Sequence, residues 1–194
     1  MSPILGIIAS SKLTAAVGDY QSIATVTGTG SSNTLEFTSI PSTYTHLQIR
    51  GIMRSASANN YDNAFITFNG SGSSYAAHYL AGDGASASAF AWTSAGRIES
   101  FYAAGGGALT DNYSTCIVDI LDYTSANKNK TVRILNGYDN NNNGATNFAK
   151  GFVIFSSGLW YATPAAITSV TITNSQGANW SNKTTFALYG IRSA

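Results

Sequence analysis

The side chains that most often carry acid–base, nucleophilic or metal chemistry are scarce in this chain of 194 residues, which holds two histidines and one cysteine. His46 and His78 each lack a carboxylate or a second histidine at the spacing that metal ligands require. We therefore expect both to be hydrogen-bonding side chains at a sheet edge. Cys116 stands in the apolar run Cys-Ile-Val-Asp-Ile-Leu, which predicts a buried thiol rather than a nucleophile.

The acidic residues, nine in all, do not suggest a hydrolytic centre. Cleavage of a glycosidic bond uses two carboxyl groups on either side of the bond. Asp119 and Asp122 fall on opposite faces of one expected strand, and Glu36 and Glu99 are isolated in the sequence. The sequence thus predicts a protein that is not an enzyme. A secreted carbohydrate-active or lectin domain stays as an alternative, because distant carboxylates can still meet in space.

Two further segments could bind a ligand. Residues 139–144, Asp-Asn-Asn-Asn-Asn-Gly, match the first half of a calcium loop, but Lys150 occupies the position of the bidentate glutamate. We interpret this segment as an Asn-rich turn and predict no metal or other cofactor. Trp160, Tyr161 and Trp180 lie near expected loops and could stack on sugar rings, with core packing or subunit contacts as the alternatives.

The composition favours strands. Only 10% of the residues are charged, against about 25% in an average soluble domain, and Ser, Thr, Asn and Gly take their place, as is typical of strands joined by turns. The net charge is +1. We interpret the small basic cluster of Lys128, Lys130 and Arg133 as a solvated turn and strand start, so no nucleic-acid partner is expected. No apolar run approaches the ~20 residues of a membrane span, so no membrane partner is expected.

Short segments with strand patterns follow one another from Tyr20 onward, separated by Gly, Asn, Ser and Pro. In one of them Leu47, Ile49 and Met53 share a face with Gly51. We expect polar or small-residue loops at 55–63 and 82–88. The expected strands are 23–27, 35–37, 47–54, 65–68, 75–80, 97–102, 115–123, 131–138, 151–155, 167–173 and 184–191. This pattern predicts an all-β fold, a two-sheet antiparallel sandwich of the jelly-roll kind spanning residues 20–194.

Residues 1–19 differ from the rest and are expected to form an N-terminal arm, with a short helix possible at 12–17. The run Ile4-Leu5-Gly6-Ile7-Ile8-Ala9 has no basic residue before it, so it makes a poor signal peptide and should stay on the mature chain. It must then be buried, either on the domain's own core or on a neighbouring subunit. The candidate partner-binding residues are Ile4, Leu5, Ile7, Ile8 and Leu13.

Three segments resemble virion proteins of bacteriophages and prophages. They are Tyr-Gln-Ser-Ile-Ala-Thr-Val at 20–26, Phe-Thr-Ser-Ile-Pro-Ser-Thr-Tyr-Thr-His-Leu-Gln-Ile-Arg-Gly at 37–51, and Thr-Phe-Ala-Leu-Tyr-Gly-Ile-Arg at 185–192. The similarity covers both ends of the chain and little of its middle. Proteins of this group look like small jelly rolls that decorate the head or belong to the tail, and their shared segments carry no catalytic residue.

The resemblance implies a structural role on the exterior of a phage particle, for a protein made in the host cytoplasm. The leading hypothesis is a capsid decoration, or cement, protein that binds as a homotrimer between subunits of the major capsid protein and stabilises the head. The alternative is a tail or fibre protein that recognises a host receptor or glycan through loops such as 140–147. Fibres usually show repeats or coiled-coil heptads, and this sequence shows neither.

Overall fold

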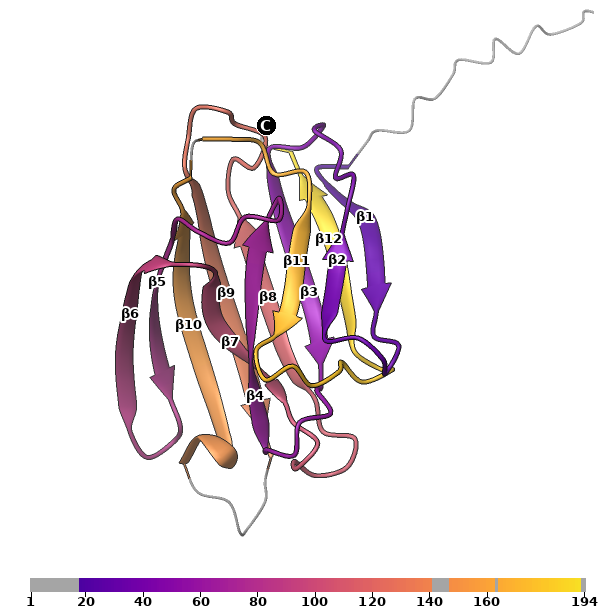
Figure 1. The fold of residues 1–194 in the computed structure, drawn as a ribbon, viewed down its shortest axis with the longest axis vertical. Coiled ribbons are helices and arrows are strands. Elements are labelled where there is room, and N and C mark those ends of the chain that lie inside the picture. The colour runs from indigo at the N-terminus through magenta and orange to yellow at the C-terminus, as the bar shows by residue number, and fades with distance from the viewer. Residues whose placement is uncertain (1–17, 141–146, 163, 193–194) are drawn as a thin grey trace, which may run out of the picture.

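The computed structural model describes residues 18–140, 147–162 and 164–192, and these form an antiparallel β-sandwich (Figure 1). No helix within these ranges is long and apolar enough to cross a lipid bilayer. The all-β, two-sheet prediction is confirmed. The elements in chain order are β1 Tyr20–Thr27, β2 Thr34–Phe37, β3 His46–Met53, β4 Tyr61–Phe68, β5 Tyr75–Gly82, β6 Ala87–Ala95, β7 Ile98–Ala104, β8 Ser114–Ile120, β9 Lys130–Asp139, the 3-10 turn η1 Asn147–Ala149, β10 Gly151–Trp160, β11 Val170–Asn174 and β12 Thr185–Ile191.

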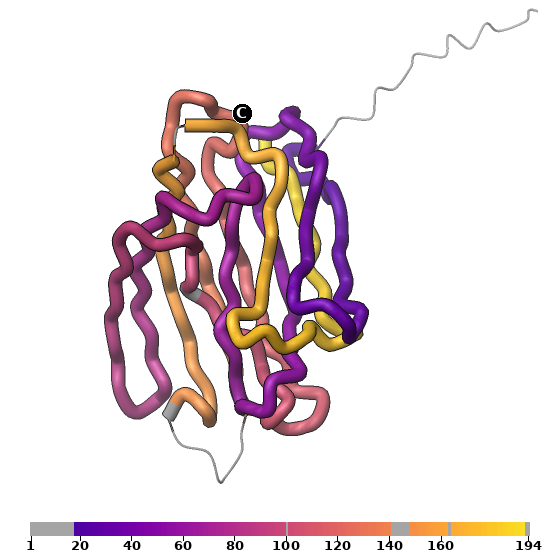
Figure 2. Tube along the Cα trace, in the orientation of Figure 1, coloured from indigo at the N-terminus to yellow at the C-terminus, as the bar shows by residue number. Residues whose placement is uncertain are grey.

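The strands form a large sheet in the order β1-β12-β3-β8-β9-β10-β5-β6 and a small sheet in the order β2-β11-β4-β7, and the paired strands run antiparallel. Two hairpins, β5–β6 and β9–β10, widen the large sheet, and the β5–β6 hairpin stands at its outer side in Figure 2. Strands β9 and β10 still pack against β7, the edge strand of the small sheet. When these two hairpins are set aside, the strand orders are β1-β12-β3-β8 and β2-β11-β4-β7. This order is consistent with the predicted jelly roll.

The core lies between the sheets and follows from the two-residue period of the strands. On β3, Leu47, Ile49 and Met53 are fully buried, as the sequence pattern predicted. Opposite them, the small sheet contributes side chains such as Phe68 and Ile172, also fully buried. The alternate residues of the large-sheet strands, such as Ile52 of β3, point to the outer face of that sheet. No second layer covers this face within the described chain.

Several strand boundaries differ from the expectation. The polar segment 55–63 was expected to be a loop, but β4 already begins at Tyr61. Strand β6 was missed altogether, because its alanines and serines show no alternation of polarity and both of its faces are exposed. Strand β10 continues to Trp160 instead of ending at 155, since its second half, Ser-Ser-Gly-Leu-Trp, alternates only weakly.

Strand β8 is shorter than predicted. It ends at Ile120, and Asp122 lies in the following turn with a positive φ of 49°. Asp119 and Asp122 therefore do not lie on opposite faces of one strand, and that prediction was wrong. Asp119 lies on the large sheet, whereas the Asp122 carboxylate accepts a hydrogen bond from Lys128 at 2.7 Å.

Candidate docking face on the large sheet

Four apolar side chains line up across the outer face of the large sheet. The antiparallel register places Ile117 of β8 opposite Leu135 of β9, Leu135 opposite Phe155 of β10, and Phe155 opposite Leu80 of β5. Their exposed fractions are 38%, 49%, 52% and 57% in that order. We name these four residues the apolar row. Contiguous apolar side chains that stay exposed are typical of a site of contact with another molecule.

The next set of cross-strand neighbours extends this apolar surface and makes it uneven. Val153 is 57% exposed and lies opposite Gly137, which in turn lies opposite Thr115. A Cβ atom added at Gly137 would meet no other atom within 4 Å, so the backbone there is open. Shallow hollows of about 330 and 230 Å³ flank Leu135. The face therefore offers side chains that can insert into a partner and hollows that can receive side chains.

A polar row borders the apolar row on the other side. Gln48, Asp119 and Arg133 are cross-strand neighbours on β3, β8 and β9. The Gln48 amide donates to Asp119 Oδ1 at 2.7 Å, and Arg133 Nη2 donates to Asp119 Oδ2 at 2.6 Å. Because these groups satisfy one another, they resemble the polar rim that surrounds the apolar centre of a protein interface.

Arg50 closes the apolar row at β3, directly opposite Ile117. Its guanidinium carbon lies 5.4 Å and 5.6 Å from the ring centres of Tyr20 and Tyr189, which are stacked at 4.8 Å. Its Nε also donates to Gln48 Oε1 at 2.9 Å. These contacts hold the cation in place beside the apolar row, in a position to meet an acidic or carbonyl group of a partner.

The candidate partner-binding residues of the arm, Ile4, Leu5, Ile7, Ile8 and Leu13, lie outside the described residues, as does the short helix expected at 12–17. The described residues begin at Gly18, just before the first strand. The carbonyl of Asp19 accepts a hydrogen bond from the Arg192 backbone N–H at 2.9 Å, and β1 then starts at Tyr20 at one edge of the large sheet.

The expectation that both histidines lie at a sheet edge was wrong, because β3 and β5 are inner strands of the large sheet, whereas the expected burial of Cys116 is confirmed. His46 Nδ1 accepts the backbone N–H of Asp122 at 2.9 Å, so this ring joins the start of β3 to the turn after β8. His78 is exposed on the outer face of β5. Cys116 is buried, and burial raises the pKa of its thiol to about 12. Among the described residues, no three His, Cys, Asp or Glu side chains gather in a way that could hold a metal ion.

Two of the three aromatic residues considered for sugar stacking are buried. Trp160 is 5% exposed and Trp180 is fully buried, whereas Tyr161 is 38% exposed. Stacking on a sugar needs an accessible ring face, so that hypothesis is wrong for both tryptophans. They pack in the core instead, Trp160 against Phe68 and Trp180 against Phe186, at ring-centre distances of 5.8 Å in each pair.

The basic cluster also differs in part from the expectation. Lys130 is not solvated, because only 1% of it is exposed and its ammonium donates to the carbonyls of Ser125 and Lys128. Burial lowers the pKa of Lys130. The side chains of Lys128 and Arg133 are exposed and bind Asp122 and Asp119.

The start of the Asn-rich segment is structural. Asn140 is fully buried, its Oδ1 accepts the Leu109 N–H at 2.9 Å, and its Nδ2 donates to the Ala149 carbonyl at 3.1 Å. Its amide thus ties together two loops rather than facing a ligand. Residues 141–146 of this segment lie outside the described residues.

Sequence reasoning missed the apolar row. Its members lie in continuous apolar runs such as Cys-Ile-Val and Phe-Val-Ile-Phe, which are typical of strands buried on both faces. The sequence did contain a sign of the apolar row, because strands that are apolar on both faces do not fit the predicted sandwich. A sandwich covers only one face of each sheet, so a strand that is apolar on both faces must expose one of them. Comparison with known protein families, with characterised proteins and with solved structures found no match to this chain.

Proposed function

We propose that this chain is a non-enzymatic structural protein of a bacteriophage particle, and that it docks on the capsid lattice through the outer face of its large sheet. The observation that carries the docking role is the apolar row, in which four cross-strand neighbours keep between 38% and 57% of their surface exposed. The particle itself is proposed from the resemblance of residues 20–26, 37–51 and 185–192 to phage virion proteins.

The chemistry of this face suits a protein partner. An interface between proteins has an apolar centre and a polar rim, which is how the apolar row and the bordering residues Gln48, Asp119 and Arg133 are arranged. A decoration protein needs no catalytic group. It stabilises a shell because it binds the assembled lattice and not the separate subunits, so that its binding free energy is added to the stability of the shell.

The test is binding of the purified full-length protein to capsids that lack it, with imaging of the particles and measurement of their heat resistance. Added density at symmetry-related positions, together with a higher temperature of capsid disruption, is the expected result. Density confined to the tail, or binding to host cells without capsid binding, would replace this proposal with the tail or fibre alternative.

The role of the face is tested separately with Leu135→Ser and Phe155→Ser. Each removes an apolar side chain that is already half exposed, so the fold should survive while capsid binding weakens at least tenfold. Leu109→Ser is the matched control, because Leu109 is equally exposed at 48% but belongs to the loop between β7 and β8. Equal effects of all three substitutions would remove the apolar row from the proposal.

The arm is tested by deletion of residues 1–17, which keeps Asp19 and its hydrogen bond to Arg192. If Ile4, Leu5, Ile7, Ile8 and Leu13 dock on a neighbouring subunit, the shortened protein should fold and bind capsids more weakly. Loss of folding would show that the arm is buried on its own domain.

A further inference from the structure

Strand β6, Ala87–Ala95, is an open edge of the large sheet (Figure 1). Among the described strands only β5 pairs with it, and its other side has no backbone partner. Six of its nine residues are exposed, including Phe90 at 52%. Such an edge presents unpaired N–H and C=O groups that can accept a further strand.

The strand carries few of the features that keep other edges from pairing. Proteins block edge strands with charged residues, prolines or bulges, and β6 contains no charge and no proline. It has one bulge, near its end, where Ser94 has a φ of 58°. Edge strand β7, in contrast, is capped by a side chain of the large sheet, since Asn136 bonds to both backbone groups of Tyr102.

The sequence of β6 is nearly the same in both directions. It runs Ala-Ser-Ala-Phe-Ala-Trp-Thr-Ser-Ala, with Ala91 at the centre. If two copies paired antiparallel about Ala91, Phe90 of each would face Trp92 of the other, and Ala89 would face Thr93. Side chains of the same class then lie opposite each other along the strand, as a two-fold symmetric interface requires.

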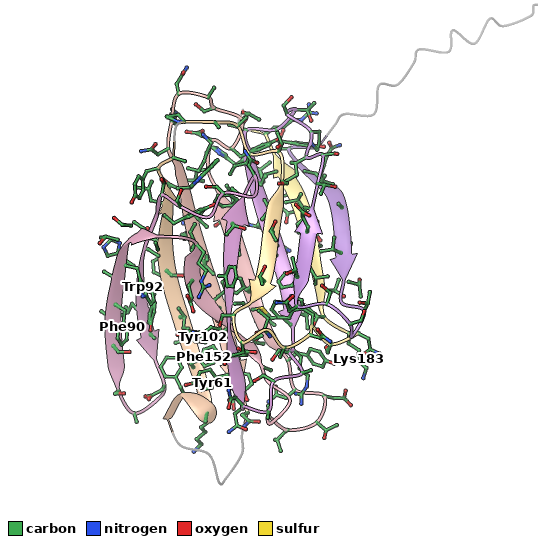
Figure 3. All side chains as sticks on the ribbon, viewed as in Figure 1. Tyr61, Phe90, Trp92, Tyr102, Phe152 and Lys183 are labelled. Carbon is green, nitrogen blue, oxygen red and sulfur yellow. The ribbon has the colours of Figure 1, made fainter. Side chains whose placement is uncertain are left out.

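The side chains on both faces fit this pairing. Phe90 and Trp92 lie on the inner face, 5.0 and 5.1 Å from the ring of Tyr79 on β5 (Figure 3). Two copies would thus join two aromatic clusters through direct cross-strand pairs of aromatic rings, which stabilise sheets. On the outer face, Ala89 and Ala91 are small and exposed, so these two side chains leave room for the approach of the second strand.

We propose that two copies of this chain associate through antiparallel pairing of their β6 strands, centred on Ala91, to form one continuous sheet across the dimer. This interface is independent of the proposed docking face, since it uses the edge of the sheet and not the apolar row. Pairing of two β6 strands predicts a dimer, whereas the resemblance to virion proteins implied a trimer.

The first test is the mass of the full-length protein by light scattering or sedimentation over a range of concentrations. The expected mass is twice 20.3 kDa, and Ala91→Lys should raise the dimer dissociation constant at least tenfold, because it sets two like charges against each other at the two-fold axis. A monomer at all concentrations, a trimer, or a dimer that is indifferent to Ala91→Lys would overturn the proposal.

The register is tested by disulfide trapping, with a matched control on the same face. Ala91→Cys places two thiols opposite each other, and under oxidation it should form covalent dimers in high yield. Ala89→Cys places its thiols about 13 Å apart along the strands, beyond the about 7 Å that a disulfide can span, and should stay uncrosslinked. Equal crosslinking of both variants, or of neither, would refute the pairing about Ala91. The native Cys116 is buried and does not compete.

Discussion

The side-chain amide of Asn136 on β9 takes the place of a missing strand beside Tyr102 on β7. Its Oδ1 accepts the Tyr102 backbone N–H at 2.8 Å, and its Nδ2 donates to the Tyr102 carbonyl at 3.2 Å and to the Thr115 carbonyl at 2.8 Å. Strand β7 is the last strand of the small sheet, so these bonds satisfy an edge that would otherwise be open. They also join the two sheets where the large one extends past the small one.

Replacement of Asn136 by alanine should therefore lower the stability of the domain. Asn136 is only 1% exposed, so water cannot easily replace its bonds, and buried backbone groups left without partners cost about 1–3 kcal/mol. We expect the free energy of unfolding in urea to fall by about that amount. Asn182→Ala is the control, because Asn182 is exposed. The free energy of unfolding of this variant should match that of the wild type. A similar loss in both variants would mean that the bonds to Tyr102 contribute little.

Two strand glycines should respond in opposite ways to the same substitution. A Cβ atom on Gly51 would lie 2.4 Å from Cδ1 of Phe186 and 3.0 Å from Sγ of Cys116, whereas one on Gly137 would meet nothing within 4 Å. Phe186 is fully buried and cannot move aside. Gly51→Ala should cost about 1–3 kcal/mol of stability by overpacking. Gly137→Ala should be neutral or stabilise by up to about 1 kcal/mol, because it reduces the freedom of the unfolded chain.

Thermal and urea unfolding of the two variants provide the measurement. Both glycines lie in central strands of the large sheet, so a general effect of alanine on strand stability would appear in each. If Gly51→Ala were as stable as the wild type, the close approach of Phe186 to β3 would not be a constraint in solution.

The sequence was sufficient for the fold class because the central strands alternate strongly. The alternation in β3 correctly predicted that Leu47, Ile49 and Met53 face the core. The apolar run around Cys116 correctly predicted that its thiol is buried. These inferences need only the two-residue period of a strand and the cost of leaving large apolar side chains in water.

The sequence was insufficient where structure depends on contacts between distant segments. Strand β6 forms because the hairpin with β5 aligns Phe90 with Tyr79, and no local pattern in an alanine- and serine-rich segment reveals that pairing. The apolar row depends on the register of four strands, so its members could be recognised only once Leu135 and Phe155 were known to be neighbours. The burial of Lys130 likewise depends on the path of the turn that supplies its carbonyl partners.

The carboxyl of Asp62 should make the stability of the domain depend on pH. Asp62 is 2% exposed, its Oδ2 accepts the Ser55 hydroxyl at 3.1 Å, and its Oδ1 has no hydrogen-bond partner among the described residues. Burial raises its pKa above 3.8, in spite of the hydrogen bond from Ser55, which acts to lower it. The unfolded chain releases this proton near pH 3.8 and the folded chain at a higher pH. The contribution of Asp62 is therefore largest below pH 3.8 and is lost as the pH rises through the folded pKa.

Asp62→Asn removes this titration and tests it. The free energy of unfolding of the wild type relative to the variant should fall as the pH rises through that window and then level off. Carboxyls whose pKa values are lowered, such as that of Asp122, act in the opposite direction, but they are present in both proteins and cancel in the difference. A difference that does not change with pH would contradict the raised pKa of Asp62.

The thiol of Cys116 should react only when the domain unfolds. It lies on the inner face of β8, 3% exposed, and burial raises its pKa to about 12. A thiol reacts through its thiolate and must be reached by the reagent, so both conditions fail in the folded state. In mildly alkaline buffer an alkylating reagent should leave the native protein unmodified and add one label in urea, as measured by intact mass. Cys116→Ala should gain no label in either condition. Labelling in native buffer at the rate of a free thiol would show that the two sheets separate at β8 without global unfolding, because the domain's single cysteine lies between them.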